Sequence, residues 1–439
     1  MSSHDDGLMH RVPWGVIAAA LIIPFIGIVN LYSAGQFSRP NLYLLQAAYL
    51  GVSLVVATFV VRMSTSTLEV IAIPAWVVTI GLLMAVLVVG TTVKGATRWL
   101  NLGFFNLQPS ELAKLTTILI TARIFSHYSE PGGYTLRDLL RPWNLTRPIG
   151  ALVFLFFRWH KQEDKLEKAV AKGIEVLPSI DGDGLKVAAV VVIVIWALLC
   201  LLDWRLEEYD FKKIVAPVDP IFLSFGLVLI EPDLGTSLIV ISIAGVQILF
   251  AGVKKGSMAI AFAALSSIAV FGWQFLLKPY QKQRVLTFLN PESDAQGAGY
   301  HAIQSKIAVG SGGTFGKGFL EGTQTQLSFL PENHTDFAFS VWAEEWGFVG
   351  GTFLIFSFAL LLGLLLYNLR FCTEKFAVLV GVGGCAMIFC HLVINISMVT
   401  GLMPVVGMTL PFVSYGGSSM VTQVLAVALA VNAITWRRA

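Results

Sequence analysis

The chain alternates long apolar runs with short polar connections along most of its 439 residues. A run of about 20 apolar residues is long enough to cross a bilayer as a helix. A helix also pairs its own backbone polar groups, as the dry lipid interior requires. The pattern therefore predicts an all-α polytopic bundle with ten transmembrane helices, at 14–32, 42–61, 68–91, 109–127, 214–231, 234–252, 257–277, 345–367, 375–399 and 413–435.

The segment 128–213 interrupts this pattern and leaves the number of helices open. It contains a basic stretch and two apolar runs, at 149–157 and 187–202. If only one run crossed the membrane, every later connection would change sides, so both cross or neither does. The sequence predicts one transmembrane domain, 1–439, with ten or twelve helices, in which 128–213 is an enlarged loop or insert.

A second interruption, 278–344, is too long and too rich in glycine to be a simple connector. Long loops in compact domains are usually functional or disordered. The aromatic residues and interspersed charges of this segment argue against disorder. We therefore interpret 278–344 as a large, ordered loop with a function.

The orientation follows from Lys and Arg in short connections, because these residues gather on the cytoplasmic side. One side of the predicted topology collects Arg11, Arg62, Lys254, Lys255, Arg370, Lys375, Arg437 and Arg438. Assigning that side to the cytoplasm places both termini inside and 278–344 outside. Lys94, Arg98 and the stretch from Lys278 to Arg284 then lie outside, against the rule, which indicates that the outer loops need cations.

Composition agrees with a membrane protein and narrows the function classes. The chain is 56% hydrophobic and 13% charged, whereas about a quarter of an ordinary soluble domain is charged. The net charge is only +3, so charge gives no indication of nucleic-acid binding.

Two carboxylates stand where one predicted helix ends and the next begins, in the stretch from Glu231 to Ser237. Pro232 breaks the helix, and Gly235 permits a tight turn. A plain turn at the membrane surface explains the stretch as well as a functional site does, although ionisable groups near membrane depth are costly and usually functional. In a functional site, a partly desolvated Asp233 would act as a general base or hold a cation.

A second polar stretch, from Gln108 to Lys114, opens another helix. Pro109 suits the first helical position, and Glu111 suits the positive end of the helix dipole. Glu111 and Lys114 are three residues apart and share one face. The favoured interpretation is a capped helix start with a local ion pair, and the alternative is a buried pair that lines a polar cavity.

The large outer loop carries cations and glycines that suit phosphate binding. Arg284, Lys306 and Lys317 accompany a glycine-rich run at 310–318, and such backbone can approach phosphates closely. The P-loop spacing is absent. Further along come Glu332, His334 and Asp336 without the HExxH zinc motif, so none of these pieces alone specifies a ligand.

Small residues open the last predicted helix, including Ser414 and Gly416, and they permit close helix contact. On the preceding helix, His391 and Asn395 share one face. An interhelical hydrogen bond is the favoured interpretation for these two side chains over a catalytic role.

Six ordered blocks between the apolar runs resemble one family. They read QPSELAKL, EPDLGTSL, GYHAIQSKIAVGSGGTFGKGF, GTQTQLSFLPENHTDF, AEEWG and LPFVSYGGSS. The chain resembles the SEDS family (shape, elongation, division, sporulation) over nearly its whole length outside 128–213. The GTQTQLSFLPENHTDF block is more similar to the elongation-type, RodA-like members than to the division-type members.

The resemblance implies a peptidoglycan glycosyltransferase that polymerises lipid II on the outer face of the cytoplasmic membrane. It maps the family's essential aspartate onto Asp233 and its buried Glu–Lys pair onto Glu111 and Lys114. The loop 278–344 would then shape the substrate groove, which makes its polar residues candidate substrate contacts. These are Arg284, Lys306, Lys317, Glu332, His334 and Asp336, whereas Gln108, Pro232, Gly235, Ser414 and Gly416 are expected to be structural.

Two features depart from the family pattern. The family often has Gln where this chain has Glu231, which changes the charge next to Asp233. The segment 128–213 is also much longer than the usual short inner loop.

The implied reaction needs a base for the attacking sugar hydroxyl and positive charge for the lipid diphosphate that leaves. We expect Asp233 to be the base or to position a metal, and Arg284 to be the leading diphosphate contact. These residues do not require a cofactor, although a divalent cation, Mg²⁺ or Mn²⁺, is compatible with them. The expected partners are a class B penicillin-binding protein, lipid II, other elongation-complex proteins and membrane lipids. A lipid-precursor flippase and a non-catalytic scaffold are the alternatives.

Overall fold

The computed structural model describes residues 12–36, 39–93, 96–101, 103, 106–127, 132–140, 217–231, 233–263, 279–291, 298–327, 329–330 and 332–436. Within these ranges, seven helices are long and apolar enough to cross a membrane. They are α2 (Trp14–Gly35), α3 (Leu42–Arg62), α4 (Thr65–Val89), α10 (Leu234–Gly252), α15 (Ala338–Leu369), α16 (Lys375–Thr400) and α17 (Gly417–Thr435).

Two further helices match predicted spans. They are α5 (Pro109–His127) and the shorter α9 (Asp219–Ile230). The tenth predicted span, 257–277, is helical over its described part within 255–263, and its remainder lies outside the described residues. The expected multi-helix architecture is therefore confirmed, whereas the choice between ten and twelve helices concerns residues that the structure does not describe.

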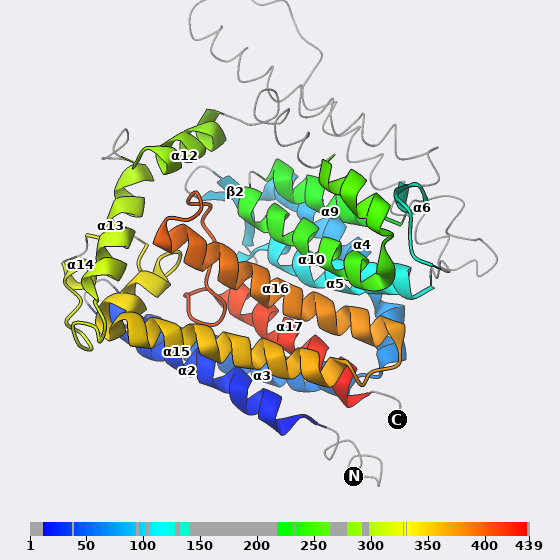
Figure 1. The fold of residues 1–439 in the computed structure, drawn as a ribbon, viewed down its shortest axis with the longest axis horizontal. Coiled ribbons are helices and arrows are strands. Elements are labelled where there is room, and N and C mark those ends of the chain that lie inside the picture. The colour runs from blue at the N-terminus through cyan, green and yellow to red at the C-terminus, as the bar shows by residue number, and fades with distance from the viewer. Residues whose placement is uncertain are drawn as a thin grey trace, which may run out of the picture.

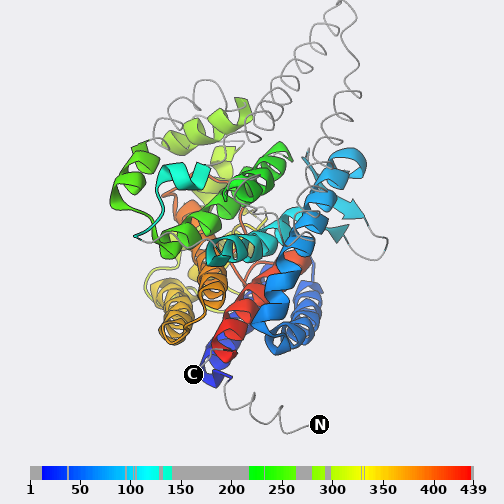
Figure 2. The same cartoon turned by 90° about the vertical axis from the view of Figure 1, so that its right-hand side faces the viewer.

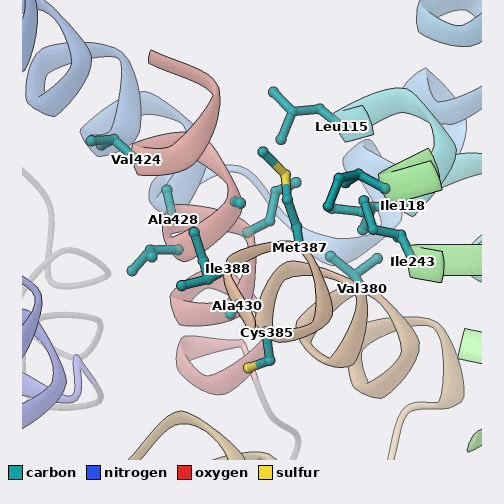
Figure 3. Close-up of a cluster of buried hydrophobic side chains, with 14 of the residues drawn as sticks. Leu115, Ile118, Ile243, Val380, Cys385, Met387, Ile388, Val424, Ala428 and Ala430 are labelled. Atoms are coloured by element: carbon teal, nitrogen blue, oxygen red, sulfur yellow. The ribbon is translucent and has the colours of Figure 1, made fainter. Parts of the chain in front are cut away.

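The interior is built from α5, α10, α16 and α17, as Figure 1 shows. Apolar side chains from all four meet in one cluster, which includes Leu115, Ile243, Met387 and Val424 (Figure 3). Figure 2 shows α17, in red, beside the blue helices of the N-terminal part, and α17 packs closely on α3. Because α16 and α17 are mostly covered, their polar residues must find partners inside the bundle.

The connections sort to two ends of the bundle. One end, here the site end, holds the connections 90–108, 231–233 and 401–416 and the helices between 279 and 337. It is joined by hydrogen bonds such as Arg98 Nε to Glu231 O and Ser418 Oγ to Asn106 O. The other end, here the terminal end, holds the ends of α3, α5, α10, α15 and α17. Asn432 Nδ2 donates there to Met63 O.

The exit of α5 and the start of α9 can each be assigned to one end of the bundle. Tyr134 follows α5 and pairs with Val253 after α10, which places the exit of α5 at the terminal end. Because α9 ends at the site end with Ile230, its start at Asp219 faces the terminal end. The exit of α5 and the start of α9 therefore lie at the same end of the bundle, and most of the chain between them, 141–216, lies outside the described residues.

The large loop is more helical than expected. It contains α12 (Pro279–Leu289), α13 (Ala298–Ser311) and α14 (Thr323–Gln326), and α15 begins at Ala338 rather than at 345. Gly347 breaks α15 with φ 66° and ψ −161°, a conformation that glycine adopts without steric cost. A side chain there would collide with the backbone of Gly316, so the loop packs directly against the break.

A small sheet at the site end was not predicted. Strands β1 (Thr91–Val93), β2 (Ala96–Asn101) and β3 (Asn106–Leu107) pair antiparallel in the order β1-β2-β3. Thr91 lies opposite Trp99, and Leu100 lies opposite Leu107. The sheet follows α4, and α6 (Leu136–Leu140) lies near the terminal end.

Candidate active site

The junction between α9 and α10 holds the predicted catalytic carboxylate. Asp233 is the N-cap of α10, and its Oδ1 accepts a hydrogen bond from Thr236 N at 3.2 Å. This explains the residue type locally, because Asp is a preferred N-cap. Asp233 is only 4% exposed, and Pro232 lies outside the described residues.

Two side chains from the connection 90–108, between α4 and α5, reach Asp233. Gln108 Nε2 donates to Asp233 Oδ2 at 3.3 Å. Arg98 Nη1 lies 3.9 Å from Asp233 Oδ1, and Arg98 Nε donates to Glu231 O at 3.3 Å. The Arg98 side chain remains 31% exposed. The junction therefore combines a buried carboxylate with a guanidinium that also faces outward.

Glu231 is the second carboxyl of the junction, and it lies between α9 and α10, outside both helices. It is 1% exposed, and neither carboxyl oxygen has a hydrogen-bond partner among the described residues. Burial, followed by the charge of Asp233, raises the pKa of Glu231 from 4.5 to about 9, and Arg98 opposes this shift. At neutral pH Glu231 is therefore protonated, and it adds no negative charge beside Asp233.

Replacing Glu231 with Gln is expected to flatten the dependence of stability on pH. Between pH 4.5 and about 9, the folded protein keeps a proton that the unfolded chain releases, so stability falls as pH rises through this window. At pH 8, Glu231→Gln should unfold at a higher temperature than the wild type. Its free energy of unfolding should be larger by about 1 kcal/mol or more. Thermal unfolding in detergent from pH 6 to 9 tests this, with exposed Glu321→Gln as control. Parallel curves for wild type and Glu231→Gln would contradict the expectation.

The connection 401–416, here the α16–α17 segment, borders the junction. An added Cβ on Gly235 would lie 2.5 Å from Met408 Sδ and 3.3 Å from Val406 O. Only glycine allows this close approach, which gives the predicted structural residue Gly235 a packing role. The segment thus forms one wall beside Asp233.

The stretch 332–336 packs on the same segment. Ser414 Oγ donates to Thr335 O at 2.6 Å, and Tyr415 N donates to His334 O at 2.8 Å. Asn395 Nδ2 donates both to Asp336 O and to Met408 O, at 2.9 and 2.6 Å. The candidate substrate residue Asp336 and the structural residue Ser414 are thus brought together.

Further contacts involve Glu332 and His334 in this stretch and Gly416 in the α16–α17 segment. Glu332 Oε2 accepts from Thr335 Oγ1 at 3.1 Å, and the His334 ring lies 6.3 Å from the ring of Tyr415. Gly416 N donates to Gln46 Oε1 at 3.3 Å. The ring contact joins the stretch 332–336 to the α16–α17 segment, and the bond to Gln46 joins that segment to α3.

Arg284 and Lys306 line a cleft on the far side of the α16–α17 segment. Arg284 is exposed, and its Nη1 donates to Val405 O at 3.1 Å. Consecutive carbonyls thus face different partners, because Val405 O meets Arg284 and Val406 O approaches Gly235. Both predicted cations border the segment that also borders Asp233.

Lys317 has a different environment from the other two predicted cations. Its Nζ lies 2.7 Å from Glu344 Oε1 and 2.8 Å from Thr323 Oγ1. Glu344 is fully buried and also accepts from the backbone of Gln324 and Thr325. The charge of Lys317 is therefore neutralised locally, and its contacts fix the start of α14 to α15.

Glu111 and Lys114 form a buried network rather than a surface ion pair. Lys114 Nζ donates to Glu111 Oε1 at 2.8 Å and to His391 Nε2 at 3.0 Å. Thr422 Oγ1 donates to Glu111 Oε2 at 2.7 Å, and His391 Nδ1 donates to Thr409 O at 3.2 Å. The favoured interpretation of an isolated helix cap was thus incomplete, because the network joins α5, α16, α17 and the α16–α17 segment.

Two solved structures share this fold over nearly the whole chain. A peptidoglycan synthase complex that coordinates polymerization and crosslinking contains a chain with 29% identity and a TM-score of 0.67, with 97% of this chain and 98% of that chain covered. The crystal structure of the Thermus thermophilus rod shape determining protein RodA gives 25% identity and a TM-score of 0.58, with 97% of each chain covered.

Sequence comparisons agree. Peptidoglycan glycosyltransferase MrdB of Escherichia coli is 34% identical over 364 residues, which cover 83% of this chain and 77% of MrdB. Peptidoglycan glycosyltransferase RodA of Treponema pallidum is 34% identical over 359 residues, 78% of each chain. The family model FTSW_RODA_SPOVE, described as a cell cycle protein, matches residues 11–221 and 190–439. The chain belongs to this family.

Membership in the FtsW/RodA/SpoVE family confirms the prediction from the six sequence blocks, and with it the enzyme class of peptidoglycan glycosyltransferase. Sequence reasoning marked Arg98 only as an outward cation and did not include it among the site residues. The signal was its violation of the positive-inside rule, but the strand β2 that carries it to Asp233 was not predicted.

Among the described residues, no group of three or more His, Cys, Asp or Glu side chains is arranged to hold a metal ion. At the junction, the groups around Asp233 are an amide, a guanidinium and a protonated carboxyl. Asp233 is thus the carboxyl group of the junction that has a guanidinium beside it.

Proposed function

We propose that this family member polymerises lipid II into glycan strands, with Asp233 as the general base. The observation that carries the proposal is the placement of Asp233 beside Arg98, with the Arg98 side chain still 31% exposed. A carboxylate that takes a proton and a cation that meets a diphosphate are the two groups that the reaction needs.

The chemistry follows from these two charges. The hydroxyl oxygen of the acceptor sugar attacks the anomeric carbon of the donor, and its proton passes to the Asp233 carboxylate. The bond between the anomeric carbon and the diphosphate oxygen breaks, and its electron pair leaves with the lipid diphosphate. Arg98 stabilises the charge that develops on this leaving group.

A divalent cation would enter with the substrate. Magnesium sites in proteins commonly combine one or two carboxylates with substrate phosphates. Asp233 is the carboxylate that could share Mg²⁺ or Mn²⁺ in that way, and the proposal needs no resident cofactor.

The proposal extends to orientation and partners. The site end would face outward from the cytoplasmic membrane, with both termini inside, because Arg62, Lys254 and Lys255 lie at the terminal end. A class B penicillin-binding protein is the proposed partner, since one structural neighbour belongs to a complex of polymerization and crosslinking. Other proteins of the elongation complex are further proposed partners in the same membrane.

One reconstitution separates the proposal from its rivals. The purified chain, lipid II and the penicillin-binding partner are incubated in vesicles, and labelled glycan is resolved by length. Polymer formation that depends on Asp233 supports the proposal. Movement of lipid II across the vesicle without polymer would favour a flippase, and partner binding without polymer would favour a scaffold.

Replacing Arg98 with Gln is expected to slow polymerisation about 100-fold, since one preorganised contact to developing charge contributes that much or more. The change should leave lipid II binding less affected than the rate. Initial rates of glycan formation measure it, and Arg62→Gln, which removes an Arg at the terminal end, is the matched control. Equal rates for Arg98→Gln and wild type would remove Arg98 from the mechanism.

A further inference from the structure

The cleft on the far side of the α16–α17 segment has a lining that the proposed base does not explain. Its walls come from α12, α13 and the end of α16 with the residues that follow. The polar lining residues are Arg284, Thr287 and Lys306. The apolar lining residues are Phe288, Pro291, Ala302, Met398, Met403 and Val405. One cleft thus presents cations beside an apolar wall.

Thr287 is the least expected member of this lining. Its side chain is 3% exposed, and Thr287 Oγ1 has no hydrogen-bond partner among the described residues. Leaving a buried hydroxyl unpaired costs about 1–3 kcal/mol. A hydroxyl in this state at the wall of a cleft indicates a ligand that accepts a hydrogen bond there.

The two cations agree with the same ligand. The exposed Lys306 has no hydrogen bond or ion pair within the described ranges. Arg284 uses Nη1 on Val405 O at 3.1 Å, and its guanidinium has further donors. An anion with several acceptor oxygens would therefore satisfy Thr287, Lys306 and Arg284 together.

The cleft is held in place by the bundle. Ser305, next to Lys306, donates through Oγ to Val399 O at 2.8 Å, and its Oγ lies 2.9 Å from Ser340 Oγ. These buried bonds tie α13 to α16 and α15. A ligand would thus meet a wall whose position is set before binding, which reduces the entropy lost on association.

We propose that this cleft binds the polyprenyl diphosphate of the acceptor lipid, an inference that rests on the proposed function. Thr287, Arg284 and Lys306 contact the diphosphate, and the apolar wall lies along the first prenyl units. The attacking hydroxyl and the diphosphate stand at opposite ends of the acceptor's disaccharide. The leaving diphosphate, in contrast, is joined directly to the carbon under attack. Arg98 beside Asp233 suits the leaving diphosphate, and the cleft across the α16–α17 segment suits the distant one.

Binding of farnesyl diphosphate to the full chain in nanodiscs tests the site. Thr287→Val is expected to weaken binding about 5-fold, as the loss of one hydrogen bond does, and Lys306→Gln about 10-fold, as the loss of a charge-assisted one does. Thr287→Ser keeps the hydroxyl, and Lys255→Gln removes a cation at the terminal end, so both should bind like wild type. Unchanged binding by both Thr287→Val and Lys306→Gln would overturn the proposal.

Phosphatidylglycerol distinguishes a specific site from a general anionic-lipid site. It should displace farnesyl diphosphate poorly, since it lacks the second phosphate, and equal competition by phosphatidylglycerol would overturn the proposal. Asp233→Asn should bind farnesyl diphosphate like wild type. Farnesyl diphosphate binding therefore tests the cleft, whereas the polymerisation rate of Asp233→Asn tests the proposed base. One proposal can fail without the other.

The acceptor assignment has its own readout. A lipid II with a blocked attacking hydroxyl serves only as donor, and a lipid II with a carbon-linked phosphonate in place of the anomeric oxygen serves only as acceptor. Thr287→Val should raise KM for the acceptor about 5-fold and leave KM for the donor unchanged. A raised KM for the donor alone would overturn the assignment.

Discussion

Asp233→Asn is expected to abolish glycan polymerisation while the protein still folds. Asn is as good an N-cap as Asp, so the hydrogen bond from Thr236 N at 3.2 Å can persist. The change removes the proton acceptor, and loss of a general base costs about 10²–10⁴-fold in rate. Labelled glycan formation from lipid II measures the rate, and the unfolding midpoint checks the fold.

A matched control makes the same chemical change elsewhere. Asp219→Asn replaces the acidic residue in the first turn of α9, away from the junction. It should polymerise lipid II like the wild type. If Asp233→Asn and Asp219→Asn are equally active, Asp233 is not the base.

Lys114→Met is expected to lower the free energy of unfolding by about 3–5 kcal/mol, the cost of removing one partner from a buried ion pair. Lys114 is fully buried, and within the described ranges the Glu111 carboxylate would keep Thr422 as its one hydrogen-bond partner. Thermal unfolding in detergent measures the loss. Exposed Lys254→Met, at the terminal end, should change stability little.

The double variant Glu111→Gln/Lys114→Met separates charge from packing. Removing both charges avoids the unpaired carboxylate, so most of the lost stability should return. Additive losses from the two single changes would show that the pair contributes through packing and not through its charges.

The long helices could be predicted because lipid imposes a simple rule on them. Apolar runs of about 20 residues have few other structures available in a bilayer. The sheet at 91–107 could not be predicted in this way, since strands of two to six residues carry too little period-two pattern. Arg98 was therefore noticed for its charge but not placed beside Asp233.

The candidate site shows the same division. Asp233 followed from a helix break and a family resemblance, and the structure places it with Gln108 and Arg98. The spacing of Glu111 and Lys114 predicted that they share one helix face but not where that face points. Their burial could therefore be known only from the tertiary structure. Thr287 gave no signal at all, because a single hydroxyl in a helix is ordinary until its surroundings are known.

The α16–α17 segment is held mainly by its main chain. Side chains from other elements bind its backbone, namely Gln46 at Ser414 O, Arg284 at Val405 O, His391 at Thr409 O, Asn395 at Met408 O and Gln423 at Phe412 N. The position of the segment thus depends little on its own side chains at several positions. Saturation mutagenesis should therefore find Gln46, Asn395 and Gln423 intolerant of exchange. Such an arrangement lets a wall of the site diversify over evolution while its course through the protein is preserved.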